Sequence, residues 1–219
     1  MPTAVVVGAG PGIGKSVADR FAREGFAVAV LARSEETLAS VREELEGRGR
    51  KVLALRADST DEEGLHAALD TVAERLGPID VLVYNAALIR PDRPGELNAK
   101  GQLDAWAVNV VGALSAATHV APGMVERGRG SIIVTGGMPK PNPALISLGL
   151  GKFGVRNLVA LLDAEYGPSG VHVASVTVPR RVIKGTDHDP DLISEHYWNL
   201  HLQPREEWQQ EVLHGGDAA

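Results

Sequence analysis

Short apolar runs alternate with longer amphipathic stretches along most of the chain. The runs are continuously apolar, which is typical of strands buried on both faces of a parallel sheet, and the stretches between them have helical spacing. We expect strands at Thr3–Val7, Ala27–Leu31, Lys51–Arg56, Asp80–Val83, Ser131–Val134 and Val171–Val176. We expect helices at Gly14–Glu24, Glu35–Glu46, Asp61–Leu76, Lys100–Arg127, Ser147–Tyr166 and Asp191–Leu200. Right-handed crossovers then predict an α/β fold, a three-layer doubly wound parallel sheet.

We expect a single domain over residues 1–219, with a lid or tail segment at about 180–219. Within that tail, Trp208–Leu213 forms either a short helix or a closing strand. The length of 219 residues suits one α/β domain of ordinary size. A formal net charge of −6 argues against a general nucleic-acid surface. The chain has no cysteine, which excludes disulfides, thiolate catalysis and cysteine-based zinc sites.

A glycine-rich loop joins the first expected strand to the first helix, in the sequence Val7-Gly8-Ala9-Gly10-Pro11-Gly12-Ile13-Gly14. Glycine lets the backbone turn tightly and approach a phosphate, and a helix N-terminus offers free N–H groups and positive dipole. On a strand–turn–helix unit, such a loop indicates dinucleotide binding.

A nucleotide-triphosphate P-loop is the rival interpretation, because Gly14-Lys15-Ser16 resembles the end of that motif. The motif requires a glycine five places before its second glycine, and position 9 is alanine. The fourth strand ends in Tyr84-Asn85, without an acidic residue for magnesium.

Arg33 follows the second expected strand, at the point where an acidic residue would bind the ribose hydroxyls of NAD. No acid is present there, and an arginine pairs well with a 2′-phosphate. We therefore expect NADP(H) to be preferred over NAD(H). The alternative is a solvated arginine at the start of a charged helix.

The spacing Gly8-x-x-x-Gly12-x-Gly14 resembles that of the short-chain dehydrogenase/reductase family, whose members have the Rossmann fold. Tyr84-Asn85-Ala86-Ala87 resembles the family's Asn-Asn-Ala-Gly segment, and Lys152 its active-site lysine. The resemblance covers about residues 3–186, and the chain is identified as a member of that family. It implies that the cofactor is held by Gly8, Gly12, Ile13, Gly14, Arg33, Asp58, Asn85, Ala86, Lys152, Pro179 and Val182.

The resemblance also implies that Lys152 and Asn109 serve catalysis, with Asn109 holding a water of the proton relay. In the family, a tyrosine four residues before the lysine is the general acid/base, and a serine on the fifth strand orients the substrate carbonyl. Here Leu148 takes the first position and Gly137, of the pair Gly136-Gly137, takes the second. Leucine cannot donate or accept a proton, and general acid–base catalysis is worth about two to four powers of ten in rate. In this respect the chain resembles a divergent branch of the family.

Other side chains are candidates to replace the missing hydroxyls. Tyr197 and His196 lie in a segment that in the family often forms a lid, so Tyr197 is a candidate catalytic residue, with packing as the alternative. Ser147 is one helical step of about 100° from Leu148, and Thr135 alternates away from position 136, so both are expected to face elsewhere. Tyr84 either approaches the cofactor or fills the edge of the sheet.

Three functions remain open at this point. The first is an NADP-dependent carbonyl/alcohol oxidoreductase with an altered proton relay. The second is a catalytically inactive module that senses NADP(H) or binds a partner. The third is a non-redox lyase or isomerase on the same fold, since a fold does not fix a function.

We expect a small-molecule substrate, no nucleic-acid or membrane partner and no metal. Arg180, Arg181, Lys184 and His188 either recognise an acidic substrate or the cofactor pyrophosphate, or form a solvated loop. The two long helices resemble those that build dimer interfaces in the family, which implies a homodimer or homotetramer. The N-terminus lacks a basic region followed by an apolar core, and we expect a cytoplasmic protein.

Overall fold

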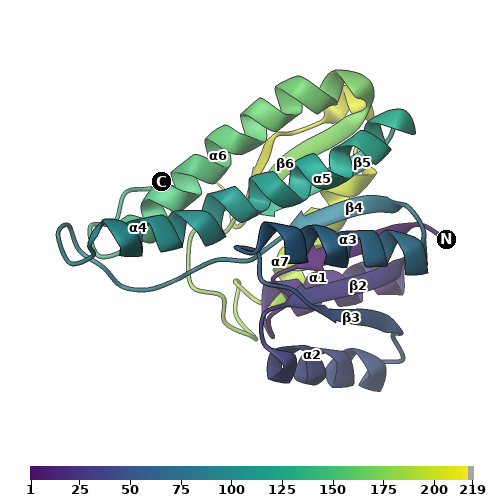
Figure 1. The fold of residues 1–219 in the computed structure, drawn as a ribbon, viewed down its shortest axis with the longest axis horizontal. Helices are drawn as coiled ribbons and strands as arrows, with labels where there is room; N and C mark the ends of the chain where they lie inside the picture. The colour runs from purple at the N-terminus through teal and green to yellow at the C-terminus, as the bar shows by residue number, and fades with distance from the viewer. Residues whose placement is uncertain (217–219) are drawn as a thin grey trace.

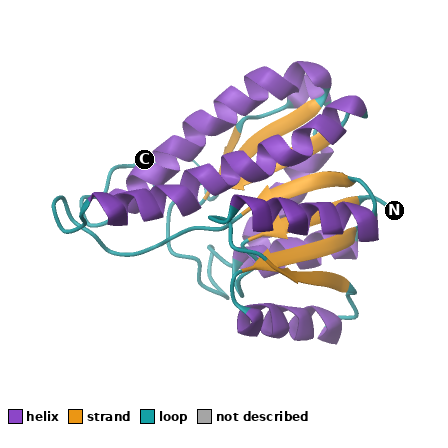
Figure 2. Ribbon diagram, in the orientation of Figure 1, coloured by secondary structure: helices purple, strands orange, loops and turns teal. Residues whose placement is uncertain are grey.

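Seven strands form one sheet in the computed structural model, which describes residues 1–216, and every pair of neighbouring strands is parallel (Figure 2). The predicted doubly wound sheet is confirmed. The strands are β1 (Thr3–Val7), β2 (Ala27–Ala32), β3 (Val52–Arg56), β4 (Ile79–Tyr84), β5 (Gly130–Thr135), β6 (Val171–Thr177) and β7 (Glu211–Leu213). The helices are α1 (Ile13–Arg23), α2 (Glu35–Gly47), α3 (Glu62–Leu76), α4 (Ala99–Trp106), α5 (Gly112–Glu126), α6 (Ile146–Tyr166) and α7 (Pro190–Leu202).

The strand order is β3-β2-β1-β4-β5-β6-β7, so the chain reverses direction across the sheet between β1 and β4. In open parallel sheets, the crevice outside the carboxyl ends of the strands at such a reversal is where ligands bind. The order therefore points to the loops that follow β1 and β4.

Two apolar cores lie on opposite faces of the sheet. One contains residues of α3, α5 and α6, and the other contains residues of α1, α2 and α7 (Figure 1). Strand residues alternate between the two cores, as Val5 and Val6 do in β1. This burial on both faces explains why the strands are continuously apolar in the sequence.

The long helix expected at Lys100–Arg127 is interrupted. A π-helical turn at Ala107–Val111 separates α4 from α5, and such turns insert an extra residue and are frequent at functional sites. The stretch Ala99–Glu126 is long and apolar enough by composition to cross a membrane, but just over half of its most apolar part is buried inside the fold.

The tail ends in a strand, because β7 pairs in parallel with β6 at the edge of the sheet. Of the two alternatives for Trp208–Leu213, the closing strand is the one found. Between α7 and this strand lies a short 3-10 turn, Arg205–Glu207. The expected domain range of 1–219 includes three residues, 217–219, that lie outside the described part of the chain.

Candidate active site

A cavity of about 1110 Å³ opens at the carboxyl edge of the sheet, where the loops after β1, β2, β4, β5 and β6 meet. Small-molecule sites usually measure about 300–1,000 Å³, so this cavity is large enough for a large ligand. The structure brings most of the predicted cofactor residues together here. Those that line the cavity are Gly8, Gly12, Ile13, Gly14, Arg33, Asn85, Ala86, Lys152, Pro179 and Val182.

The glycine loop is tight where it meets the protein and open where it faces the cavity. Gly8 has φ +87°, and a Cβ there would overlap the backbone of Ala86. A Cβ at Gly14 would lie 2.7 Å from the Gly8 carbonyl oxygen, whereas one at Gly12 would meet nothing within 4 Å. The first turn of α1 carries no acidic residue, so the open face of the loop fits a phosphate group.

Arg33 lies exposed at the rim of the cavity beyond the end of β2. Asp58 is not among the lining residues, although its neighbours Ala57 and Ser59 are. Burial alone would raise the pKa of Asp58, but hydrogen bonds from Thr60 and the charges of Arg33 and Arg56 lower it. Asp58 is therefore a carboxylate beside the cavity whose nearest hydrogen bonds go to Thr60.

Lys152 extends from α6 toward the end of β5, and only 7% of it is exposed. Its Nζ donates a hydrogen bond of 2.6 Å to the backbone oxygen of Thr135. Burial lowers the pKa of this amine to about 8, because a low-dielectric environment penalises the charged form. The pKa of the lysine is therefore close to neutral pH, which suits a group that transfers protons.

Leu148 lies one helical turn before Lys152 on the same face of α6, and both line the cavity. The two glycines after β5 differ in the space that a side chain would find. A Cβ at Gly136 would overlap the Thr177 hydroxyl, whereas one at Gly137 would lie 3.6 Å from Lys152 Cγ, at ordinary contact distance. Position 137 is thus the one where a side chain would stand beside the lysine.

A buried carboxylate fixes the start of α6. The carboxylate of Asp92 accepts hydrogen bonds from the backbone N–H of Ser147 at 3.0 Å and from its hydroxyl at 2.8 Å. Ser147 therefore faces away from the cavity, as expected from its position beside Leu148. These two hydrogen bonds hold the helix end that carries both Leu148 and Lys152.

Asn109 lies in the π-helical turn and is 1% exposed. Its Oδ1 accepts a hydrogen bond of 2.9 Å from the backbone N–H of Leu88, and the residue is not among those lining the cavity. The side chain thus holds the segment after β4. Tyr84, at the end of that strand, is buried and donates a 2.5 Å hydrogen bond to the Val108 oxygen, so it fills the sheet edge.

Tyr197 and His196 do not form a lid. They belong to α7, which packs against α1 on one face of the sheet. Tyr197 is fully buried, and its hydroxyl lies 2.7 Å from the Thr135 hydroxyl, while His196 Nε2 lies 2.9 Å from His214 Nδ1. The connection after β6, residues 178–189, leads into this packed helix, so Tyr197 lies under the sheet and not in a lid over the cavity.

Sequence reasoning did not find the apolar wall of the cavity. It comes from loops after β4 and β5 and includes Leu88, Ile89, Met138 and Leu145. Met138 has φ +49°, a conformation that is uncommon for a residue with a side chain and clusters at functional sites. In the sequence, only the position of these residues after the carboxyl ends of central strands could have indicated that they line the cavity.

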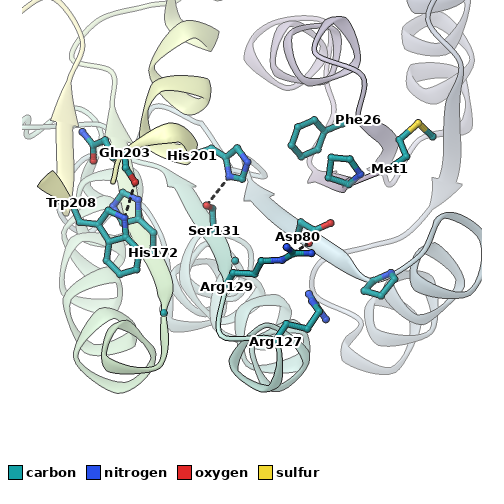
Figure 3. Close-up of a pocket in the computed structure, with 14 residues that line it drawn as sticks. Met1, Phe26, Asp80, Arg127, Arg129, Ser131, His172, His201, Gln203 and Trp208 are labelled. Carbon is teal, nitrogen blue, oxygen red and sulfur yellow. Dashed lines mark hydrogen bonds and ion pairs between the residues drawn. The ribbon is translucent and has the colours of Figure 1, made fainter. Parts of the chain in front are cut away.

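A second cavity, of about 640 Å³, lies at the opposite, amino edge of the sheet (Figure 3). Its lining includes Phe26, Arg127, Arg129, His172 and Trp208. Here Ser131, near the start of β5, forms a 2.9 Å hydrogen bond with His201 of α7. This end of the sheet holds none of the residues predicted to bind a cofactor.

The comparisons with known proteins agree with this geometry. A family profile described as short chain dehydrogenase matches residues 2–189. The glycine betaine reductase of Emericella nidulans is 34% identical over 179 residues, which are 79% of this chain but only 14% of that protein. A short-chain dehydrogenase/reductase of Armillaria gallica is 33% identical over 175 residues, covering 78% of this chain and 67% of that protein.

A solved structure of a metagenomic short-chain oxidoreductase in complex with NADP is similar to the whole fold. It has a TM-score of 0.87 at 26% identity and covers 97% of this chain and 95% of that one. The chain therefore belongs to the short-chain dehydrogenase/reductase family of NAD(P)-dependent oxidoreductases.

Proposed function

We propose that this protein is an NADP(H)-dependent oxidoreductase that interconverts a carbonyl and an alcohol group of a small molecule. The observation that carries the proposal is one cavity shared by the open face of the glycine loop and the buried amine of Lys152. Family membership supports it, and the residues at the loop fit a dinucleotide pyrophosphate. The cofactor, when bound, supplies or accepts the hydride.

Arg33 supports the preference for NADP(H) over NAD(H). Its guanidinium stands at the rim where β2 ends, together with Ser34 and Thr37. A guanidinium binds a phosphate through charge-assisted hydrogen bonds, whereas the site offers no acid for the free ribose hydroxyls of NAD. Asp58 and Pro179 complete the proposed cofactor site on either side.

Lys152 is the proposed proton donor in reduction, directly or through a water. Leu148 and Gly137, which carry no hydroxyl, occupy the two positions beside the lysine where the family has its tyrosine and serine. A pKa near 8 leaves both forms of the amine populated around neutral pH. Asn109 contributes by holding the Leu88 backbone at the wall of the cavity.

The substrate side of the cavity favours an amphipathic molecule. Leu88, Met138, Leu145 and Leu148 form an apolar wall, and Arg180 and Arg181 lie exposed at the mouth. An apolar body would bury against the wall while an acidic group faced the two guanidinium groups. We therefore propose a carbonyl compound that carries a carboxylate or similar anion.

Calorimetric titration of the purified protein with NADPH and NADH tests the cofactor, and a carbonyl panel with and without carboxylates tests the chemistry. We expect tighter binding of NADPH, and turnover that is lost in Lys152→Ala. Lys100→Ala is the control, because Lys100 is exposed and pairs with Asp104 away from the cavity. Failure to bind either dinucleotide would refute the proposed function.

A catalytically inactive NADP(H)-sensing module is the second candidate. The observation in its favour is the absence of a hydroxyl at positions 148 and 137, since the family reaction depends on one. Tight NADPH binding without hydride transfer to any member of the panel would establish this alternative. Turnover abolished by Lys152→Ala would exclude it.

We also propose that the protein forms a homodimer or homotetramer through α4, α5 and α6. Large apolar side chains are exposed at helical spacing along these helices and the π turn between α4 and α5. Exposed apolar groups that recur on one face mark an interaction surface. They are Leu103, Trp106, Val111, Leu114, Leu150, Phe153 and Leu161. Light scattering after size exclusion tests this, and Leu114→Asp is expected to shift the protein toward monomer.

A further inference from the structure

Thr135, the last residue of β5, is the centre of a buried hydrogen-bond network. Its backbone oxygen accepts from Lys152 Nζ at 2.6 Å. Its hydroxyl lies 2.8 Å from Asn85 Oδ1 and 2.7 Å from the Tyr197 hydroxyl. Asn85 Nδ2 in turn donates to the Gly8 oxygen at 2.8 Å. The network therefore runs from α7, through the carboxyl ends of β5 and β4, to the glycine loop.

The chemistry of the groups fixes the direction of each hydrogen bond. The Gly8 carbonyl only accepts, so the amide nitrogen of Asn85 faces it and the amide oxygen faces Thr135. That oxygen also only accepts, so the single hydroxyl proton of Thr135 is donated to it. The Tyr197 hydroxyl must then donate to Thr135. With this assignment each polar side-chain atom of the three residues has a hydrogen-bond partner, and each side chain holds the next in one orientation.

Asn85 is the part of the network that touches the loop. It binds the Gly8 oxygen, and a Cβ at Gly14 would lie 3.2 Å from its Nδ2, so the amide fits between two glycines. The backbone N–H of Gly10 donates to the same Gly8 oxygen at 2.9 Å. The orientation of the Asn85 amide therefore sets where the loop backbone stands.

We propose that Tyr197 is a positioning residue for the cofactor site, which fixes the glycine loop through Thr135 and Asn85. Tyr197 does not line the cavity and is fully buried on the other side of β5, so it acts through these two residues and touches neither cofactor nor substrate. The inference rests on the proposed function, because it assigns α7 a part in dinucleotide binding.

The fold supplies a matched pair of contacts for testing this. At the amino edge of the sheet, Ser131 and His201 join β5 to α7 by a 2.9 Å hydrogen bond (Figure 3). Ser131 lies four residues before Thr135, and His201 four residues after Tyr197, so the two bonds connect the same two elements at opposite ends. Only the bond at Tyr197 continues to the glycine loop.

The experiment compares Tyr197→Phe with Ser131→Ala. Amide hydrogen exchange of the ligand-free protein, followed by NMR, reports on the loop at Gly8, Ala9 and Gly10. Titration with NADPH reports on binding. We expect Tyr197→Phe to speed loop exchange at least fivefold and weaken NADPH binding about tenfold, with both values close to wild type in Ser131→Ala.

Thr135 variants give a second line of evidence. Thr135→Ser keeps the hydroxyl and is expected to retain loop protection, whereas Thr135→Val removes it and is expected to match Tyr197→Phe. Loop exchange that stays unchanged in Tyr197→Phe, or that rises equally in Ser131→Ala, would overturn the proposal. If wild-type protein bound neither dinucleotide, the proposed function would fail, but loop exchange would still decide whether Tyr197 positions the loop.

Discussion

Because the amine of Lys152 is buried, we predict that the stability of the folded protein depends on pH, and this can be measured without a substrate. The residue is 7% exposed, and its hydrogen bond goes to a neutral backbone oxygen of Thr135. Burial lowers the pKa of the amine from 10.5 to about 8. The unfolded chain exposes the same lysine to water, where its pKa returns to about 10.4. The two states therefore bind a different number of protons between these values.

The sign of the effect follows from which state holds the proton. Between pH 8 and 10.5 the unfolded chain binds more protons at Lys152 than the folded protein does, so stability contributed by this residue rises with pH. Each tenfold difference in proton affinity corresponds to about 1.4 kcal/mol. Across the whole interval, the folded protein should gain about 3 kcal/mol from this residue.

Urea unfolding of wild type and of Lys152→Met at pH 7, 8, 9 and 10 measures this gain. Methionine fills a similar volume without an amine, and subtracting the two curves cancels the titration of all other groups. We expect the variant to be favoured at pH 7 relative to pH 10, with the difference changing by two to three kcal/mol. Lys100→Met, at an exposed position, should show no such change. Parallel curves for wild type and Lys152→Met would refute the reasoning.

Three further outcomes follow from the site. Leu148→Tyr combined with Gly137→Ser should raise turnover about 100-fold in steady-state kinetics, the lower end of general acid–base effects, and an unchanged rate would contradict the role given to the missing hydroxyls. Gly136→Ser should instead lower the melting temperature of the protein, because a Cβ at position 136 would overlap Thr177. Arg33→Asp should reverse the preference toward NADH in a titration, and an unaltered ratio of the two dissociation constants would exclude Arg33 as the phosphate ligand. In the wild type, the reduction rate should fall as pH rises through about 8, where Lys152 loses its proton; a pH–rate profile that is flat there would argue against this donor.

The fold was largely predictable because its signals are local. Buried strands and amphipathic helices have different periodicities, and these place β1 to β6 within one or two residues of the predicted ranges. The interruption of the long helix at Ala107–Val111 was not predictable, because the π turn accompanies contacts that Asn109 makes with the distant segment at Leu88. The strand β7 was left open for a similar reason, since only three residues pair with β6.

The candidate site divides in the same way. The glycine loop, Arg33 and Lys152 were found from motif and order along the chain, and the structure gathers them in one cavity. The family resemblance implied that Tyr197 lies in a lid, whereas the structure packs it behind β5. Short-range patterns do not say which face of the sheet a tail helix covers, because that depends on the apolar surface that the other helices leave open.

By itself, the sequence determined the parallel α/β fold, the glycine loop and the absence of a hydroxyl four residues before Lys152. Only the tertiary structure decided that Gly137 is the position with space beside Lys152, that burial brings the pKa of this lysine to about 8, and that hydrogen bonds through Thr135 and Asn85 connect Tyr197 to the glycine loop. The reason is physical: Thr135 and Tyr197 are 62 residues apart, and Asn85 and Gly8 are 77 apart. Space, burial and hydrogen bonding between such residues exist only once the sheet has brought them together.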